Sequence, residues 1–482
     1  MFNGTMMQYF HSFLPRSCKL WTKVERESEN LRNLGITSVW LPPAYKGMDG
    51  NNDMGYAPYD LYDLGEFLQK GTIETKYGYK EEYIQAIRSL QDNNIQVYGD
   101  IVLNHKMGAD STEEVICKEV DFFHRNSEIS EEEKIIAWTK FIFANREEKY
   151  SDFKWNYRHF HGIDYDERSK RKALFKFVDK NWDEDVDKEN DNYDYLMGCD
   201  IDFSNNEVVD ELEKWGKWYL NIANLDGFRL DAVKHISANF YKQWLKVMRE
   251  HCNKELFAVG EYWHSNVEVL LNYINDTEGV MSLFDVPLHY NFYEASHNAD
   301  YDMRNIFNNT LVSRYPTKAV TFVDNHDTEI NASLESWVLP WFKIIAYGLI
   351  LLRIDGYPCV FYEDYYGGEE NDYISIQSEL EKILYVRKEL AYGDQYDYFD
   401  DRNIIGWTRA GDSSFYNSGI AVVISNGKNG YKDMYIGEIY KDIIFIDILN
   451  NSNEEVKINE NGIGRFFVSS KNISIWIIKS EK

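Results

Sequence analysis

The sequence predicts an α/β protein: a (β/α)8 TIM barrel with a subdomain inserted after strand 3 and a C-terminal antiparallel β-sandwich. Three observations predict this fold. Short apolar runs recur along most of the chain and alternate with amphipathic stretches. One connection between two such runs is very long. Near residue 392 the pattern changes to short segments bounded by Gly and Asn, which is typical of an antiparallel sheet.

The eight apolar runs are rich in Val, Ile, Leu and Phe and do not alternate with polar residues. This pattern indicates strands buried on both faces, as in a parallel barrel. The runs cover residues 6–10, 38–41, 97–103, 227–230, 257–259, 283–286, 320–323 and 360–362. Helices are predicted in the amphipathic stretches 81–91, 208–221, 240–250 and 377–387.

These patterns divide the chain into four segments. Residues 1–103 form the first part of the barrel, 104–206 the inserted subdomain, and 207–392 the second part of the barrel. Residues 393–482 form the sandwich, with strands expected at 404–408, 420–425, 443–448, 456–458 and 473–478. An insertion after a barrel strand is expected to cover the active face, because catalytic groups lie at the C-terminal strand ends.

Charge and composition exclude several classes of partner. Lys and Arg number 52 and Asp and Glu 80, so the net charge is −28. A nucleic-acid surface needs a basic stripe, and an anionic membrane needs basic residues. We therefore expect neither partner, and we expect a monomer. Aromatic residues make up 16% of the chain, which suits a protein that stacks flat ligands such as sugars.

The cysteine pattern and the N-terminus favour a cytoplasmic protein. The five cysteines form no CxxC pair, and their odd number does not suggest a disulfide framework. The first residues lack a basic segment followed by a long apolar stretch. No apolar run approaches the ~18 residues of a membrane span.

Polar residues cluster where four of the predicted strands end. The segments are DIVLNH at 100–105, GFRLDAVKH at 227–235, GEYW at 260–263 and FVDNHD at 322–327. In a parallel barrel these ends meet at one mouth, so Asp231, Glu261 and Asp327 are expected to converge. Hydrolysis of a glycosidic bond needs two carboxyl groups that flank the bond.

These four segments, in this order, resemble the signature regions of the α-amylase family of glycoside hydrolases, in particular its bacterial liquefying and cytoplasmic members. The similarity extends to VWLPPAYKG at 39–47, YDLYDLGEF at 59–67 and WFK at 341–343. It implies an endo-acting α-amylase that hydrolyses internal α-1,4-glucosidic bonds of starch, glycogen or maltodextrins with retention of configuration.

The resemblance implies a role for each acid. Asp231 is the nucleophile that forms a glycosyl-enzyme, and Glu261 is the acid and then the base. Asp327 stabilises the transition state by binding hydroxyls of the distorted sugar. Arg229 lies two residues before Asp231 and shares its face of the strand, so its charge is expected to keep Asp231 ionised. Two carboxyl groups roughly 5 Å apart would give retention.

The resemblance also implies contacts with the substrate. His105 and His326 hydrogen-bond the sugar at the cleavage point, and Tyr56 stacks on that ring. Contacts on the leaving-group side come from Lys234, His235 and Trp263; for His235, donation of its backbone carbonyl to a metal is an equal alternative. Phe13 stands where relatives often have a larger polar aromatic residue, so affinity for that sugar is expected to differ.

The resemblance further implies one Ca²⁺ between the barrel and the inserted subdomain, held by Asn104, Asp194, Asp200 and the His235 carbonyl. Oxygen ligands of these kinds suit calcium. Secreted relatives carry a second calcium and a sodium. This chain keeps Asp183 and Asp202, but it has His161 and Ser204 where those relatives have Asp. We therefore expect a single calcium.

Three alternatives remain open. The first is an oligosaccharide-directed α-glucosidase or a transglycosylase on the same fold, although the AVKH sequence after Asp231 favours an α-amylase. The second is a catalytically silent glycan-binding protein, although such proteins usually lose one of the acids. The third is a metal-dependent barrel hydrolase, although no His-x-His pair lies at a predicted strand end.

Overall fold

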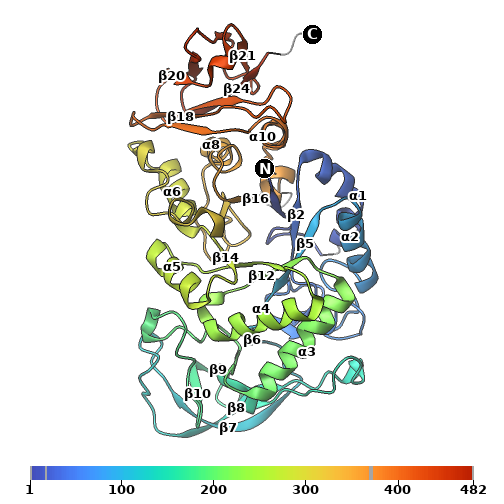
Figure 1. Cartoon of the computed structure of the whole chain (residues 1–482). Helices are drawn as coiled ribbons and strands as arrows, with labels where there is room; N and C mark the ends of the chain where they lie inside the picture. The colour runs from blue at the N-terminus through green and yellow to red at the C-terminus, as the bar shows by residue number, and fades with distance from the viewer. Residues whose placement is uncertain (1–2, 17–18, 369–372, 480–482) are drawn as a thin grey trace.

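The computed structural model describes residues 3–16, 19–368 and 373–479. Eight parallel strands close into a barrel in the middle of the molecule (Figure 1), which confirms the predicted fold class. Around the barrel the order is β1-β16-β15-β14-β13-β12-β5-β2. The strands are β1 (Met6–Gln8), β2 (Ser38–Leu41), β5 (Gln96–Ile101), β12 (Gly227–Leu230), β13 (Phe257–Gly260), β14 (Ser282–Phe284), β15 (Ala319–Phe322) and β16 (Tyr357–Phe361).

Every one of the eight apolar runs became a barrel strand, with small shifts at the ends. The strands β2, β12 and β15 are buried at every position, as expected for a sheet enclosed by helices and filled by its own side chains. The last run begins earlier than predicted, and Tyr362 opens a short helix, α9 (Tyr362–Tyr366), instead of ending the strand.

Helices cover the outside of the barrel, and polar caps define several of their ends. The Asn205 side chain accepts a hydrogen bond from the Glu207 backbone at the start of α3, and Ser237 and Asp285 cap α4 and α6 in the same way. The main helices are α1 (Leu20–Leu34), α2 (Lys80–Asp92), α3 (Asn206–Ala223), α4 (Ala238–Cys252), α5 (Val267–Asp276), α6 (Val286–His297), α7 (Leu311–Arg314), α8 (Pro340–Leu351) and α10 (Gln377–Glu389).

The long connection after β5 folds into an antiparallel sheet of six strands, which the sequence did not predict in detail. Its strand order is β6-β11-β9-β10-β7-β8. The strands are β6 (His105–Lys106), β7 (Ser111–Glu119), β8 (Glu133–Lys140), β9 (Phe160–Asp166), β10 (Arg171–Phe177) and β11 (Cys199–Ile201). This sheet lies at one end of the molecule, beyond α3 and α4 (Figure 1). A further short pair, β3 (Lys46–Gly47) and β4 (Pro58–Asp60), precedes α2.

The C-terminal region contains a six-stranded sheet and a two-stranded one, β20-β23, with an apolar core that includes Val423, Met434 and Phe466. It packs against the barrel through α8, where a Cβ atom on Gly348 would lie 2.2 Å from Ile473 Cδ1. The strands are β17 (Gln395–Tyr398), β18 (Ile404–Arg409), β19 (Ile420–Ser425), β20 (Gly430–Tyr435), β21 (Ile444–Asp447), β22 (Val456–Lys457), β23 (Ile463–Val468) and β24 (Asn472–Ile478).

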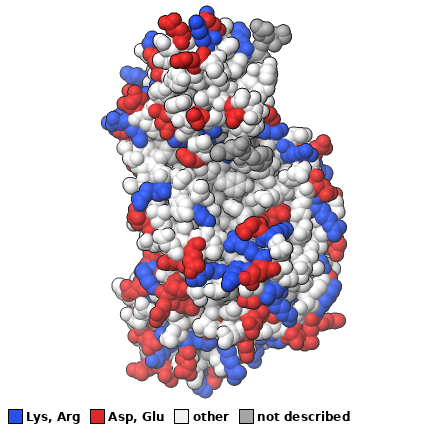
Figure 2. All heavy atoms as spheres, viewed as in Figure 1, with Lys and Arg blue, Asp and Glu red and all other residues white. Residues whose placement is uncertain are grey.

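Charged side chains of both signs lie interspersed on the face drawn in Figure 2. Cys117, Cys199, Cys252 and Cys359 are free thiols, and Cys18 lies outside the described residues. Within the part of the chain that the structure describes, none of the helices combines the length and apolar character needed to cross a bilayer.

Candidate active site

The three acids singled out in the sequence line one cavity at the C-terminal mouth of the barrel. Asp231 follows β12, Glu261 follows β13, and Asp327 lies in the loop after β15. All three border a cavity of about 470 Å³. They meet there because parallel strands present their C-terminal ends at the same mouth.

A single arginine joins the acids. Arg229, which is fully buried on β12, contacts Asp231 Oδ1 through Nη1 at 2.7 Å and Glu261 Oε2 through Nη2 at 2.8 Å. Nη1 also donates to Asp100 Oδ1 at 2.8 Å. Asp100 accepts two further hydrogen bonds, from Trp40 Nε1 and the Tyr56 hydroxyl. Asp100 therefore fixes the position of the Arg229 guanidinium.

Burial has the largest effect on the pKa of Asp231. Loss of water raises that pKa well above its usual range, and the charges of Glu261 and Asp100 raise it further. Arg229 acts in the opposite direction, as the sequence predicted, but it does not cancel the effect of burial. Arg229 thus favours the ionised form of Asp231, as predicted, while burial acts against it.

The residue after Asp231 positions Glu261. Ala232 adopts a left-handed backbone conformation with φ of 46°, which is uncommon for a residue other than glycine. In this conformation its N–H group donates to Glu261 Oε2 at 3.2 Å. Glu261 Oε2 thus contacts both the Ala232 N–H and the guanidinium of Arg229, whereas Oε1 makes neither of these contacts.

Two buried histidines border the acids. His326 Nδ1 accepts a hydrogen bond from Gln8 Nε2 at 3.1 Å, so the proton lies on Nε2, which is 3.2 Å from Asp327 Oδ2. His105 Nε2 lies 2.9 Å from the backbone oxygen of Tyr56. Burial lowers the pKa of His105 to about 4 and that of His326 to about 3, so both rings are neutral near pH 7.

The remaining residues predicted to contact substrate also border the cavity. The Tyr56 ring stacks on the His326 ring, with centroids 5.0 Å apart. Lys234 contacts Glu189 Oε2 at 2.9 Å and the Trp263 backbone oxygen at 3.2 Å. Trp263 is partly exposed, and its indole N–H donates to the Tyr290 hydroxyl. His235 Nδ1 lies 2.6 Å from the Tyr193 backbone oxygen.

The four residues predicted to hold a metal lie in the same region, between the barrel and the inserted sheet. Asp200 on β11 pairs with His105 on β6, which places it beside Asn104. Asp194 and Asp200 are both buried and contact the same nitrogen of His161, whose Nδ1 lies 3.0 Å and 3.1 Å from their Oδ2 atoms. His235 is linked to Tyr193, the neighbour of Asp194.

The family model described as "Alpha amylase, catalytic domain" matches residues 24–435 of this chain. This match covers most of the chain. The chain belongs to the α-amylase family. It is therefore a glycoside hydrolase of that family, built on the barrel that carries the three acids.

Two relatives illustrate how close this α-amylase is to known proteins. The α-amylase of Geobacillus stearothermophilus is 52% identical over 479 residues, which cover 99% of this chain and 87% of the relative. The cytoplasmic α-amylase of Escherichia coli (strain K12) is 43% identical, with 99% of each chain covered. The structure of an α-amylase from Geobacillus thermoleovorans, complexed with acarbose, has the same fold, with a TM-score of 0.64 at 17% identity over 99% of this chain and 98% of the other.

The α-amylase family is typically calcium-dependent, and the buried oxygens near β11 fit such an ion. Asn104 Oδ1 and Nδ2 are both buried without a hydrogen-bond partner in the described part of the chain, and so is Asp200 Oδ1. Amide and carboxylate oxygens are the ligands that calcium prefers. A bound calcium would supply positive charge between the buried acids.

His161 and Ser204, which stand where the secreted relatives have Asp, both contact Asp202. His161 is buried, and its Nε2 lies 3.1 Å from Asp202 Oδ1, so the ring bridges Asp202 to Asp194 and Asp200, which contact its Nδ1. Lys180 also forms an ion pair with Asp202, and Ser204 donates to Asp202 Oδ1 at 2.5 Å. His161 and Lys180 thus contact Asp202, one of the two aspartates around which additional metals were considered.

Several cavity residues of this α-amylase were not found from the sequence. Ser333 donates to Asp327 Oδ1 at 2.9 Å, and Gln8 holds His326. Gln8 ends β1, so the rule about strand ends would have found it. No local pattern marks Ser333, which reaches Asp327 only because the loop folds back on itself through the Leu334 N–H and the Asp327 carbonyl. Phe13, already singled out in the sequence, also lines the cavity. Other lining residues are Ser12, Met54, Tyr193, Leu196, Met197, Asn331, Ala332 and Leu334.

Proposed function

We propose that this protein is an endo-acting α-amylase that cleaves internal α-1,4-glucosidic bonds of starch, glycogen or maltodextrins with retention of configuration. One observation carries the proposal: Arg229 contacts both Asp231 and Glu261 at the mouth of the barrel, with Asp327 in the same cavity. Two carboxyl groups that face each other across one guanidinium suit a double displacement, in which one attacks and the other transfers protons.

Asp231 is the nucleophile in this proposal. Its carboxylate attacks the anomeric carbon, the bond to the glycosidic oxygen breaks, and a covalent glycosyl-enzyme forms. Arg229 supports the ionised form of Asp231, because its charge opposes the effect of burial on the pKa. The contact at 2.7 Å also fixes which oxygen of Asp231 remains available for attack.

Glu261 is the acid and then the base. Its proton goes to the departing glycosidic oxygen in the first step. In the second step a water molecule gives a proton back to Glu261 and attacks the anomeric carbon, which releases Asp231. The Ala232 N–H and Arg229 both hold Oε2, so Oε1 is the oxygen that carries the proton.

Asp327 binds hydroxyls of the distorted sugar and stabilises positive charge in the transition state. Its partners Ser333 and His326 set the direction of its two oxygens. The neutral rings of His105 and His326 donate hydrogen bonds to the same sugar or accept them from it. Tyr56 stacks on that sugar. On the leaving-group side, contacts come from Lys234, Trp263 and His235.

We also propose one calcium ion, held by Asn104, Asp194, Asp200 and the His235 carbonyl. The buried, unpartnered oxygens of Asn104 and Asp200 support this site. The contacts of His161 and Lys180 with Asp202 argue against a second calcium and a sodium. The ion would link the inserted sheet to the barrel and keep the acids from repelling one another.

The cytoplasm is the proposed compartment, and the proposed state is a monomer. The similarity to the cytoplasmic α-amylase of Escherichia coli supports the compartment. Size-exclusion chromatography with light scattering tests the second statement, with 57.0 kDa expected for one chain.

The decisive experiment compares wild type with Glu261→Gln on soluble starch and on a maltoheptaoside blocked at its non-reducing end. The substitution keeps the shape of the side chain and removes the transferable proton. General acid catalysis contributes roughly 10²–10⁴-fold, so kcat should fall by at least that lower value. Glu278→Gln, which changes an exposed glutamate, is the control and should leave kcat unchanged.

The same assay separates the alternatives. Internal cleavage of the blocked substrate supports an endo-acting enzyme, and NMR of the first product should show the α-anomer. Cleavage of unblocked oligosaccharides only would favour an α-glucosidase, and longer products would favour a transglycosylase. If wild type binds both substrates without cleaving them, a silent glycan-binding protein becomes the better account.

A further inference from the structure

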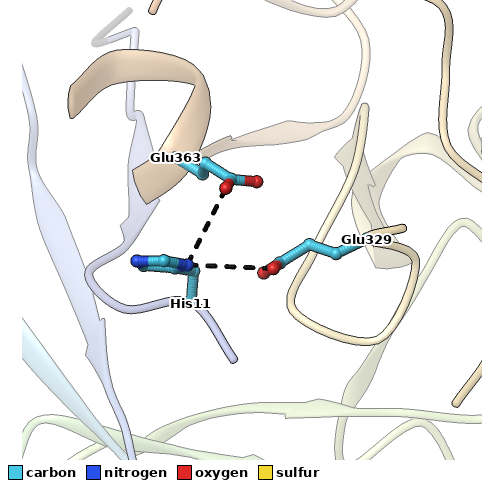
Figure 3. A group of neighbouring side chains, drawn as sticks. All are labelled: His11, Glu329 and Glu363. Atoms are coloured by element: carbon cyan, nitrogen blue, oxygen red, sulfur yellow. Dashed lines mark ion pairs between the residues drawn. The ribbon is translucent and has the colours of Figure 1, made fainter. Parts of the chain in front are cut away.

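A second group of titratable side chains lies at the same end of the barrel, outside the machinery described above. It consists of His11, Glu329 and Glu363, and we call it the His–Glu–Glu cluster (Figure 3). The three residues come from different segments: His11 follows β1, Glu329 follows β15, and Glu363 lies in α9 after β16. They converge because β1, β16 and β15 are neighbours in the barrel.

The cluster is buried and its atoms face one another. His11 Nδ1 lies 3.7 Å from Glu329 Oε2 and 3.9 Å from Glu363 Oε1. Figure 3 shows both carboxylates directed toward the same nitrogen of the ring. These distances exceed the range of about 2.7–3.2 Å for a hydrogen bond. Both glutamates are completely inaccessible to water, and His11 is nearly so.

One oxygen of the cluster accepts no hydrogen bond. Glu329 Oε1 accepts from the Ser12 N–H at 3.2 Å, whereas Glu329 Oε2, directed at His11, has no hydrogen-bond partner among the described residues. A buried carboxylate oxygen without a donor costs free energy unless a proton or a cation compensates it. This oxygen therefore points to a positively charged ligand in the centre of the cluster.

We propose that the His–Glu–Glu cluster binds a divalent transition-metal ion, with zinc as the representative ion, through His11 Nδ1 and one oxygen each of Glu329 and Glu363. Zn–N and Zn–O bonds are each about 2.1 Å long, so two bonds together span on the order of 4.2 Å. That length exceeds both observed N···O distances, and the three ligand atoms all lie within 4.8 Å of one another, so small side-chain movements suffice for one ion to reach all three.

The donor set selects the kind of metal. An imidazole nitrogen beside two carboxylates suits zinc, cobalt, manganese or iron, whereas calcium prefers six to eight oxygens. This site therefore differs in chemistry from the calcium site proposed near Asp200. The proposal does not depend on amylase activity, because it rests on residues other than the three acids.

The ion would tie together three loops that border the active site. Ser12 Oγ donates to the backbone oxygen of His326 at 2.6 Å, while its N–H donates to Glu329. Glu329 lies two residues after Asp327 in the same loop. Metal occupancy should therefore stabilise the part of the barrel mouth that holds Asp327 and His326.

The test is a metal titration of the full chain. The protein is stripped with EDTA, dialysed, saturated with excess Ca²⁺ to fill the oxygen site, and then titrated with Co²⁺. Wild type should bind one Co²⁺ per chain, with the visible absorption of cobalt bound to imidazole and carboxylate. His11→Gln and Glu329→Gln should lose this absorption and the bound cobalt. His124→Gln, which changes an exposed histidine paired with Asp191, is the matched control and should retain both.

Thermal unfolding supplies an independent readout. In excess Ca²⁺, added Zn²⁺ should raise the unfolding midpoint of wild type and His124→Gln, but not that of the two cluster variants. The proposal is overturned if wild type binds no Co²⁺ beyond the calcium site, or if folded His11→Gln or Glu329→Gln binds it as wild type does. Circular dichroism shows whether the variants fold; if they do not, the stoichiometry and the Zn²⁺-dependent midpoint of wild type decide the question.

Discussion

Arg229 on β12 and Asp100 on β5 are directly opposite each other in neighbouring strands, and their side chains meet at 2.8 Å. Both are fully buried. Asp100 makes no direct contribution to the proposed chemistry. It fixes the guanidinium that contacts the nucleophile and the acid, so the geometry of the site depends on a pair formed deep inside the barrel.

Asp100→Asn should therefore reduce both stability and activity. The substitution removes one of the buried carboxylates that contact Arg229. It also introduces an amide NH₂ group opposite the hydrogen-bond donors of Arg229, Trp40 and Tyr56. Breaking a buried ion pair costs roughly 3–5 kcal/mol. Urea unfolding followed by tryptophan fluorescence measures the loss. Asp433→Asn is the control: its partner Arg465 is exposed, so its loss should stay below about 1 kcal/mol. Equal losses for the two variants would contradict this account.

Ser333→Ala should lower kcat/KM by about five-fold, the value of one ordinary hydrogen bond. Burial raises the pKa of Asp327, and the bond from Ser333 lowers it. Removing that bond moves the pKa further upward, so the acidic limb of the pH profile should shift to higher pH. A pH–rate profile measures the shift, with Ser414→Ala, an exposed serine of the C-terminal region, as control. An unchanged acidic limb would rule out this role for Ser333.

His289 should make stability depend on pH. Burial lowers the pKa of His289 to about 4, below the unfolded value near 6.5. The unfolded chain therefore binds the proton more readily, and stability falls as the pH drops from about 6.5 toward 4. The effect amounts to at most about 3 kcal/mol. His289→Gln should flatten the stability profile in this window relative to wild type.

The control for this prediction is His297→Gln, which changes an exposed histidine on the same helix, α6. Its profile should follow that of wild type, because this side chain remains in water when the protein folds. Thermal unfolding at several pH values between 4 and 7 gives both profiles. A wild-type slope in His289→Gln would show that other groups cause the dependence.

Calcium removal should destabilise the protein before it affects catalysis. Without the ion, the buried carboxylates of Asp194 and Asp200 keep His161 as a partner but lose the positive charge of the calcium. A chelator should lower the unfolding midpoint, and activity should fall at the rate of unfolding and return with calcium. Immediate and complete loss at low temperature would instead indicate a metal that takes part in the reaction.

His161→Asp should increase the number of calcium ions bound. The substitution removes an imidazole that contacts three aspartates and introduces another carboxylate at the same place. Elemental analysis after dialysis against calcium should give one calcium for wild type and more for the variant. Three metals in wild type would contradict the proposal of a single site.

The sequence by itself determined the barrel and the identity of the acids. Apolar runs such as 227–230 are predicted as strands because they do not alternate with polar residues, as expected when both faces are buried. Asp231 and Glu261 follow such runs directly. The rule that parallel strands end at one mouth then places these side chains together, without knowledge of any contact. The inserted sheet was harder to predict, because its strands are half-exposed and pair across long loops.

Only the tertiary structure decided contacts between segments that are distant in the chain. The hydrogen bond from Ser333 to Asp327, the three aspartates around His161, and the convergence of His11, Glu329 and Glu363 all depend on how loops fold over the strand ends. The net pKa of Asp231 was decided in the same way. The sequence showed the arginine two residues away, but the depth of burial, which outweighs that charge, is a property of the folded chain.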